Sequence, residues 1–290
     1  MLLAHQTLFD SELLTIRYAV ARPSALPLSE LEHARADLLL LPVAGLFARH
    51  DSPKHHFVAN PNHGLFFNHG QPYRISFPGG IGDDCLVLQL SKPALANLLA
   101  DTAGTEELSS GCIDRHCLLS PAAVLQRELL QAHLKRGAAD ALAIEEISVS
   151  LFSASIRAAH NDSGRKDGAR HASTRSRRQL QAETVKELIS LHPAREWTLS
   201  ALAREAAVSP YHLARVFREE VGVPIHQYLI RTRVGKALAA MRADSSDLTG
   251  IALEAGFAHH SHFTSSFREF FGMTPSQFRH KRLHVTAAGK

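Results

Sequence analysis

The C-terminal third of this chain repeats one helical pattern, and that repeat constrains the fold more than any other feature. Apolar residues recur at i, i+3, i+4 and i+7 in two stretches that begin forty-nine residues apart. This spacing predicts an apolar stripe along one helix in each stretch. The members are Leu199, Leu202, Ala203 and Ala206 in the first stretch and Leu248, Ile251, Ala252 and Ala255 in the second.

Each stripe is followed by a second apolar set that stops at a glycine. The sets are Leu213, Phe217 and Val221 before Gly222, and Phe263, Phe267 and Phe271 before Gly272. Glycine takes the left-handed conformation that caps a helix, and the proline that soon follows each glycine cannot continue one. Ser209 and Pro210 suit an N-cap and a first helical residue, so a helix is predicted from about 210 to 221.

Two short helices joined by a tight turn form a helix-turn-helix unit, whose second helix enters the major groove of DNA. Residues 224–243, between the two pairs, predict a connecting helix of about nineteen residues, roughly 28 Å long. One turn of B-DNA is about 34 Å, so this length suits two reading helices in successive major-groove segments. A helical core with a merely solvated polar face remains the alternative on spacing alone.

The residues of this region resemble the DNA-binding domain of the AraC/XylS transcription regulators. The resemblance covers roughly a hundred residues. It is carried by WTLSALAREAAVSPYHLARVFREEVGVPIHQYLIRTRVGKALAAM at 197–241 and LTGIALEAGFAHHSHFTSSFREFFGMTPSQFR at 248–279. The second segment is the more specific, because its glycine, phenylalanine and proline positions follow the family signature closely.

The resemblance implies a bipartite reader of double-stranded DNA with RNA polymerase as a further partner. Residues expected at bases are Tyr211, Ala214 and Arg215 in the first unit and His260, Ser261, His262 and Ser265 in the second. We expect Arg215 to read a base edge, and Arg218 and Arg268, one turn further along, to contact phosphates. Many family members have arginine where this chain has Ser265, so the second helix is expected to read few bases. Activation and repression both remain open.

The charge distribution agrees with a DNA-binding C-terminal half. Residues 1–160 hold twelve Lys and Arg against sixteen Asp and Glu, a net charge of −4, whereas residues 161–290 hold twenty against twelve, a net charge of +8. A basic region favours a polyanionic partner, because phosphate contacts release counterions.

The N-terminal half is predicted to be an antiparallel β structure followed by helices. Short apolar runs from His56 to Leu90 alternate with turns rich in Gly, Pro, Asn and Asp, which favours a small sandwich or barrel. The stretch ANPNHGLFFNHGQPYRIS resembles the cupin-like sensor domains that precede AraC-type readers. That resemblance implies a small effector in the barrel or a dimerisation platform. Helices are predicted over about 121–135 and 139–160, and the apolar seam of the second can pack on its own barrel or pair with a twin helix as a homodimer.

We therefore predict a two-domain α+β protein. A cupin-like effector-binding and dimerisation domain at 1–160 is followed by a flexible basic linker at 161–178 and a double helix-turn-helix domain at 179–285. The linker prediction rests on six basic residues and the absence of any large apolar side chain.

Other kinds of chemistry find little support in the sequence. No catalytic residues, metal ligands or cofactor are predicted, because no metal triad or paired acid and base stands out among the N-terminal histidines.

The chain start reads as neither a signal peptide nor a membrane span, which favours a cytoplasmic protein. Cys85, Cys112 and Cys117 leave open a redox-responsive regulator, against inert buried thiols. A non-specific architectural DNA-binding protein is the other alternative.

Overall fold

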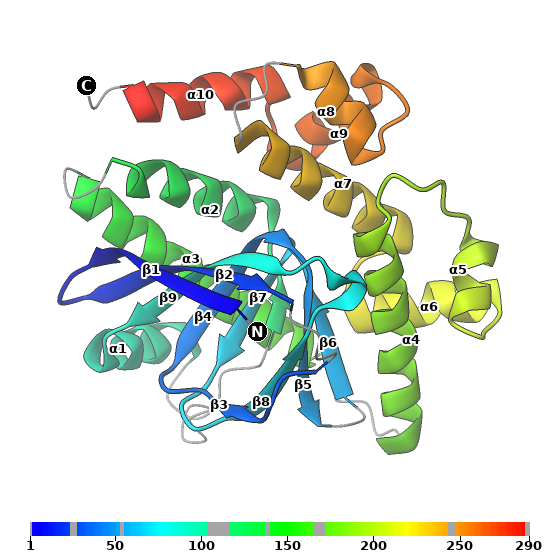
Figure 1. Cartoon of the computed structure of the whole chain (residues 1–290), viewed down its shortest axis with the longest axis horizontal. Helices are drawn as coiled ribbons and strands as arrows, with labels where there is room; N and C mark the ends of the chain where they lie inside the picture. Colours follow the sequence, from blue (N-terminus) through cyan, green and yellow to red (C-terminus); the bar gives the residue numbers. More distant parts are fainter. Residues whose placement is uncertain are drawn as a thin grey trace.

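Two facing antiparallel sheets form the N-terminal part of the protein (Figure 1). The computed structural model describes residues 2–23, 28–52, 55–103, 116–136, 140–164, 172–242 and 247–287. The strand order is β1-β2-β9-β4-β7-β10 in the first sheet and β3-β8-β5-β6 in the second. The strands are β1 Leu2–Asp10, β2 Leu14–Arg22, β3 Glu32–His33, β4 Leu38–Gly45, β5 Phe47–Ser52, β6 His55–Ala59, β7 His63–Phe67, β8 Pro72–Ser76, β9 Asp83–Leu90 and β10 His116–Leu118, with a 3-10 turn, η1, at Pro78–Gly80.

The two faces of the six-stranded sheet pack into different cores, because side chains alternate along each strand. Successive side chains of a strand point to opposite sides, so Ile16 and Leu88 pack into the core beneath the helices. Ala19 and Val87 belong to a second core between the two sheets. The predicted antiparallel β structure is confirmed, and the pairing of β4 with β9 has a register shift between Pro42 and Ala44.

Three helices cover the outer face of the six-stranded sheet. They are α1 Lys92–Ala103, α2 Pro121–Leu134 and α3 Ala141–Gly164. The hydroxyl of Ser120 accepts a hydrogen bond from the backbone N–H of Ala123 and caps α2, as its position before a proline predicts. Ile144 and Leu151 of α3 are fully buried in the core under the sheet, so the predicted seam packs on its own β structure.

The described residues of the C-terminal part form helices joined by short turns. Its helices are α4 Ala172–Leu191, α5 Leu199–Glu205, α6 Pro210–Val221, α7 Ile225–Arg242, α8 Leu248–Ala255, α9 His260–Phe271 and α10 Pro275–Ala287. The two short helix pairs and the long connecting helix follow the predicted bounds closely. None of the described helices has both the length and the apolar character to cross a bilayer.

The structure corrects the extent of the predicted linker. Helix α3 continues to Gly164 and α4 already begins at Ala172, so helix occupies both ends of the segment 161–178, while residues 165–171 lie outside the described part. Arg178, near the end of the segment, is buried and forms ion pairs with Glu219 and Glu220 of α6. Local composition predicts a flexible linker because it does not reveal these acidic partners on a distant helix.

The helical part packs directly on the β part. Helix α4 runs beside β6, and α10 lies over α2 (Figure 1). The core of α7 to α9 is continuous with the core of the six-stranded sheet. The α5–α6 pair instead has its own small core with α4 and the start of α7.

Candidate nucleic-acid interface

Helix α6 is fixed at both ends by residues that its sequence supplies. The Ser209 hydroxyl accepts a hydrogen bond from the backbone N–H of His212 at 3.3 Å, and Pro210 opens the helix. At the other end Gly222 adopts a φ of 85°, and its N–H donates to the carbonyl of Arg218 at 3.0 Å. One side of the helix is fully buried and carries Leu213, Val216 and Phe217. The opposite side is therefore held rigidly toward solvent.

The exposed side of α6 carries the residues predicted for the first reading helix. We call it the first outer face; it comprises Tyr211, Ala214, Arg215 and Arg218, all exposed. Tyr211 is 90% exposed, which is unusual for a large ring without a bound partner. The face thus combines an uncovered aromatic ring with two arginines on adjacent turns.

Helix α9 repeats this construction with one difference at its start. Phe263 and Phe267 are fully buried, and Gly272 caps the end with a φ of 72° and an N–H bond to the carbonyl of Arg268 at 2.8 Å. His259 stands at the N-cap without a side-chain capping bond. The backbone N–H groups of the first turn consequently lack the acceptor that Ser209 provides in α6.

The exposed side of α9 presents fewer available polar groups than the sequence suggests. The second outer face comprises the exposed residues His260, Ser261, Ser265 and Arg268. The Ser265 hydroxyl donates into its own helix, with the carbonyls of Ser261 and His262 at 2.9 and 3.1 Å. His262 is half-buried with its ring edge-on to Phe257, and burial together with Arg233 lowers the pKa of its imidazole. His262 therefore favours the neutral form.

The turns inside the two units differ at one corresponding position. Ala207, between α5 and α6, has a φ of 53°, and Gly256, forty-nine residues later between α8 and α9, has a φ of 99°. A residue with a Cβ is strained in this left-handed region. A Cβ on Gly256 would in addition lie 2.5 Å from the Cα of Ala194. The repeat thus tolerates alanine in one copy and requires glycine in the other.

Helix α7 holds one unit near each of its ends (Figure 1). Its eighteen residues span roughly 27 Å. Near its start, the rings of Tyr228 and of Phe217 in α6 lie 5.5 Å apart, and near its end Leu238 shares a core with Phe263 and Phe267. The two arginines in the middle of α7 bind within the protein. Arg231 donates to the carbonyl of Leu119, and Arg233 donates to that of Pro193.

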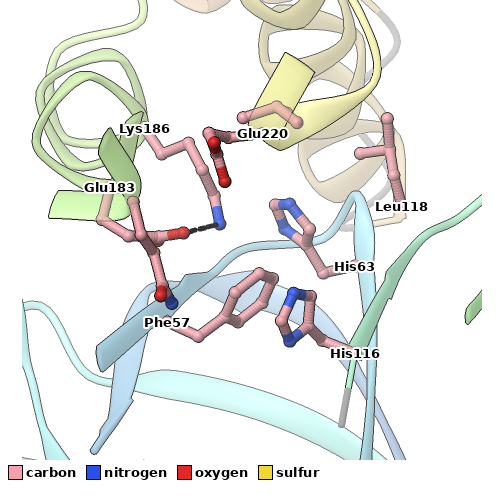
Figure 2. A pocket seen from close by; sticks show the side chains of 9 residues that line it. Phe57, His63, His116, Leu118, Glu183, Lys186 and Glu220 are labelled. Carbon is pink, nitrogen blue, oxygen red and sulfur yellow. Dashed lines mark hydrogen bonds and ion pairs between the residues drawn. The ribbon is translucent and has the colours of Figure 1, made fainter. Parts of the chain in front are cut away.

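A polar pocket between α4 and the β part was not predicted from the sequence (Figure 2). Its volume of about 30 Å³ is enough for a single water molecule. Glu183 of α4 accepts a hydrogen bond from the backbone N–H of Val58 at 2.7 Å, and it pairs with Lys186 at 2.9 Å. The Lys186 ammonium lies 3.5 Å from the centroid of the Phe57 ring, which also stacks on the ring of His116 and meets that of His63 edge-on. The spacing of three between Glu183 and Lys186 was the only local signal.

Further polar contacts join the β part and its helix α2 to α7. The amide of Asn60 donates to the hydroxyl of Tyr228 at 3.0 Å, and both side chains are buried. Glu128 of α2 is fully buried and pairs with Arg127 at 3.1 Å and with Arg242, at the end of α7, at 2.8 Å. The two arginines lower the pKa of Glu128 against the effect of burial. Buried charges of this kind require their partners in place, so these contacts fix α7 on the β part.

A larger cavity of about 1010 Å³ opens between the two sheets. Its walls include the inner faces of β2 and β9, the aromatic side chain of Phe67 from β7 of the same sheet, and that of Phe47 from β5 of the other sheet. Arg17 and Gln89 lie at one end of these strands and Asp83 at the other. Burial raises the pKa of the Asp83 carboxyl to about 6. The sequence predicted a pocket in the barrel but did not identify its lining.

Comparison with known proteins identifies the domain formed by the C-terminal helices. The family profile of the helix-turn-helix domain matches residues 202–281. An uncharacterized HTH-type transcriptional regulator of Staphylococcus aureus is 33% identical over 102 residues, which are 35% of this chain and 14% of that protein. An AraC-like transcription regulator of Streptomyces lividans is 37% identical over 94 residues, 32% of this chain and 31% of that protein. The chain thus matches less than a third of the length of these relatives.

One solved structure with similarity to the same region is a DNA-binding transcriptional dual regulator from Escherichia coli K-12. It is 29% identical, the match covers 36% of this chain and 93% of that one, and the TM-score is 0.34.

The two short helix pairs and the family match define the class of the C-terminal region, which is a helix-turn-helix domain. Its type is that of the AraC-like regulators, so the resemblance of this region to their DNA-binding domain is confirmed.

Proposed function

We propose that this protein is a sequence-specific DNA-binding transcription regulator of the AraC type. The observation that carries the proposal is the pair of outer faces on α6 and α9. Each helix buries one side completely and is capped by a glycine, while its polar side is exposed to solvent. A rigid helix with an exposed polar face is what major-groove binding requires.

The proposal gives the residues of the outer faces different roles. Arg215 reads a base edge in the major groove, because a guanidinium can donate two hydrogen bonds to guanine; Tyr211 and Ala214 lie beside it on the same face. Arg218 and Arg268 contact phosphates, which position the protein without specifying sequence. The remaining candidates contribute through α9 and are His260, Ser261, His262 and Ser265. Ser265 contributes least, because its hydroxyl already donates within the helix.

The proposal also covers the rest of the chain. Residues 1–160 act as a cupin-like effector-binding and dimerisation domain, and residues 179–285 act as the DNA-binding domain. Helix α3 buries Ile144 and Leu151 against its own sheet, so a homodimer uses its other face, where Leu142 is 70% exposed. RNA polymerase is the further partner of the DNA-bound protein.

Effector control is supported by a continuous path from the cavity to the DNA-binding helices. Phe47 of β5 lines the cavity and pairs with Ala59 of β6. Val58, the neighbouring residue of β6, donates its N–H to Glu183 of α4, and α4 shares a core with α6. An occupant that shifts β5 therefore changes the position of the first outer face, because packed elements move as units.

The redox-responsive alternative gains no support from the two cysteines that the structure describes. Cys85 and Cys117 are both buried, and burial raises the pKa of the Cys85 thiol well above its ordinary value. A thiol with a raised pKa reacts slowly, because the thiolate is the reactive form. Cys112 lies outside the described residues.

The test is selection of bound duplexes from a random library with the full-length protein, followed by footprinting on the enriched sequence. The proposal predicts an enriched motif with two protected segments about one helical turn apart. If no sequence is enriched while duplexes still bind, the protein is a non-specific architectural one.

A further inference from the structure

The cavity between the sheets has a polar group with unused hydrogen-bonding capacity at one end. Arg17 of β2 lines the cavity, and one terminal nitrogen donates to the side-chain oxygen of Gln89 at 3.0 Å. A guanidinium has five N–H donors in a planar fork. The bond to Gln89 holds the fork in place and uses one nitrogen, so donors remain for an occupant.

The acidic side chains that line the same cavity, unlike Arg17, act as hydrogen-bond acceptors within the protein. Glu32 accepts a hydrogen bond from the hydroxyl of Tyr73 at 3.1 Å. Asp83 accepts one from the thiol of Cys85 at 2.7 Å. In the strand register Arg17 faces Val87 and Ala21 faces Asp83, so Arg17 and Asp83 are four residues apart, roughly 14 Å along the sheet. Arg17 and Asp83 therefore mark two separate ends of this wall of the cavity, and Arg35 lines the cavity as well.

The space between these ends is apolar and wide. Ala19 and Val87 leave it open on the side of the six-stranded sheet, and Phe47 and Phe67 contribute aromatic surface. The volume of about 1010 Å³ lies at the upper end of the range for sites that bind small molecules. An apolar body there removes surface from water, while an oxyanion at Arg17 forms charge-assisted hydrogen bonds.

We infer that this cavity binds a small organic anion, with a carboxylate or similar oxyanion at Arg17 and an apolar body along Ala19 and Val87. The inference rests on the effector control proposed above and names the chemical class of the effector. A neutral molecule of the same shape lacks the bond to Arg17 and binds less tightly.

Two fluorescent probes with one aromatic body test the charge requirement. The probe 8-anilinonaphthalene-1-sulfonate carries an oxyanion, and N-phenyl-1-naphthylamine does not. We expect the full-length protein to bind the sulfonate with the lower Kd. Arg17→Gln should raise the Kd of the sulfonate about tenfold or more, since a hydrogen bond to a charged group contributes about 1.5–3 kcal/mol. The Kd of the neutral probe should stay within about twofold.

Two further variants locate the probes. Arg22 lies on the same strand but pairs with Asp84, away from the cavity lining, so Arg22→Gln should leave both Kd values unchanged. Ala19→Phe places an aromatic ring in the space along Ala19 and Val87 and should weaken binding of both probes, while circular dichroism verifies that each variant is folded. The inference is wrong if the wild type binds neither probe, if Arg17→Gln leaves the Kd of the sulfonate unchanged, or if folded Ala19→Phe protein binds both as tightly as the wild type.

A separate measurement distinguishes this inference from the proposed function. Arg17→Gln should bind duplex DNA as the wild type does when no probe is present. If the wild type fails to bind DNA while the probes discriminate as expected, the DNA-binding proposal fails and the anion site stands. If DNA binds and the probes do not discriminate, the anion site fails alone.

Discussion

The carboxylate of Glu183 accepts a hydrogen bond from the backbone N–H of Val58 at 2.7 Å. Val58 is buried in β6, the edge strand of the four-stranded sheet. An edge strand presents backbone groups without a neighbouring strand, and here a side chain from the helical part provides the acceptor. The contact therefore satisfies a buried donor of the β part only while α4 is docked.

Removing the Glu183 carboxylate should strongly destabilise the docked arrangement. Glu183→Ala deprives the N–H of Val58 of its acceptor and the buried Lys186 ammonium of this counter-charge. We expect a loss of about 3 kcal/mol in the free energy of unfolding, measured by urea denaturation. Glu187, one turn further on α4 and only partly buried, is the control, and Glu187→Ala should change stability by less than about 0.5 kcal/mol. Equal effects of the two substitutions would contradict the role of the contact.

The corresponding turns of the two helix pairs should respond oppositely to exchange of alanine and glycine. Ala207→Gly relieves the left-handed strain at a φ of 53°, and we expect a change between zero and about 1 kcal/mol of stabilisation. Gly256→Ala introduces the same strain and a Cβ 2.5 Å from the Cα of Ala194, so it should destabilise by about 2 kcal/mol or more. Thermal unfolding measures both. If Ala207→Gly destabilised the protein as Gly256→Ala does, the strain assigned to Ala207 would be contradicted.

The inward hydrogen bonds of Ser265 lead to a prediction about DNA affinity. Ser265→Ala should change the Kd for duplex DNA by less than about twofold, because the hydroxyl donates to the carbonyls of Ser261 and His262. Ser265→Arg should tighten binding and steepen the salt dependence by about one unit, since a new cation reaches a phosphate. Titrations at several salt concentrations measure both quantities. A large loss of affinity in Ser265→Ala would assign the hydroxyl to a base contact.

Asp83 should make stability fall as the pH rises from about 4 to about 6. Burial raises the pKa of its carboxyl from 3.8 to about 6 in the folded protein, so in this window the folded state binds more protons than the unfolded state. Its stabilising contribution is complete below pH 4 and is lost above pH 6, a change of about 3 kcal/mol. Asp83→Asn should remove that part of the pH dependence, as measured by urea denaturation at each pH. Exposed Asp101 provides the control: if Asp101→Asn has the same effect, Asp83 is not responsible.

The elements with local signals were predictable, and the contacts between distant segments were not. The periodic apolar residues and the cap residues Ser209, Gly222 and Gly272 predicted α6 and the end of α9, because helix caps depend on residues close in sequence. The contact of Glu183 with Val58 joins residues 125 positions apart, and the charge cluster at Glu128 includes Arg242, 114 positions away. No periodicity encodes such pairs. The inward bonds of Ser265 are local and were hidden for a different reason, because they depend on the rotamer that its side chain adopts.

The predicted linker shows the limit of composition as a signal. Its C-terminal residues are polar and basic, yet they form the first turns of α4, because Arg178 pairs with two glutamates of α6. A segment without large apolar side chains can still be ordered when distant charges anchor it.

The most direct test of DNA recognition is the ratio of Kd values for a scrambled duplex and for the duplex enriched by selection, measured at one salt concentration. Arg215→Ala should lower this ratio by about 1–3 kcal/mol in free-energy terms and relax the preference at one base position. Arg268→Ala should weaken both duplexes alike, leave the ratio unchanged and reduce the salt slope by about one. A ratio that Arg215→Ala leaves at the wild-type value would contradict base reading by the first outer face.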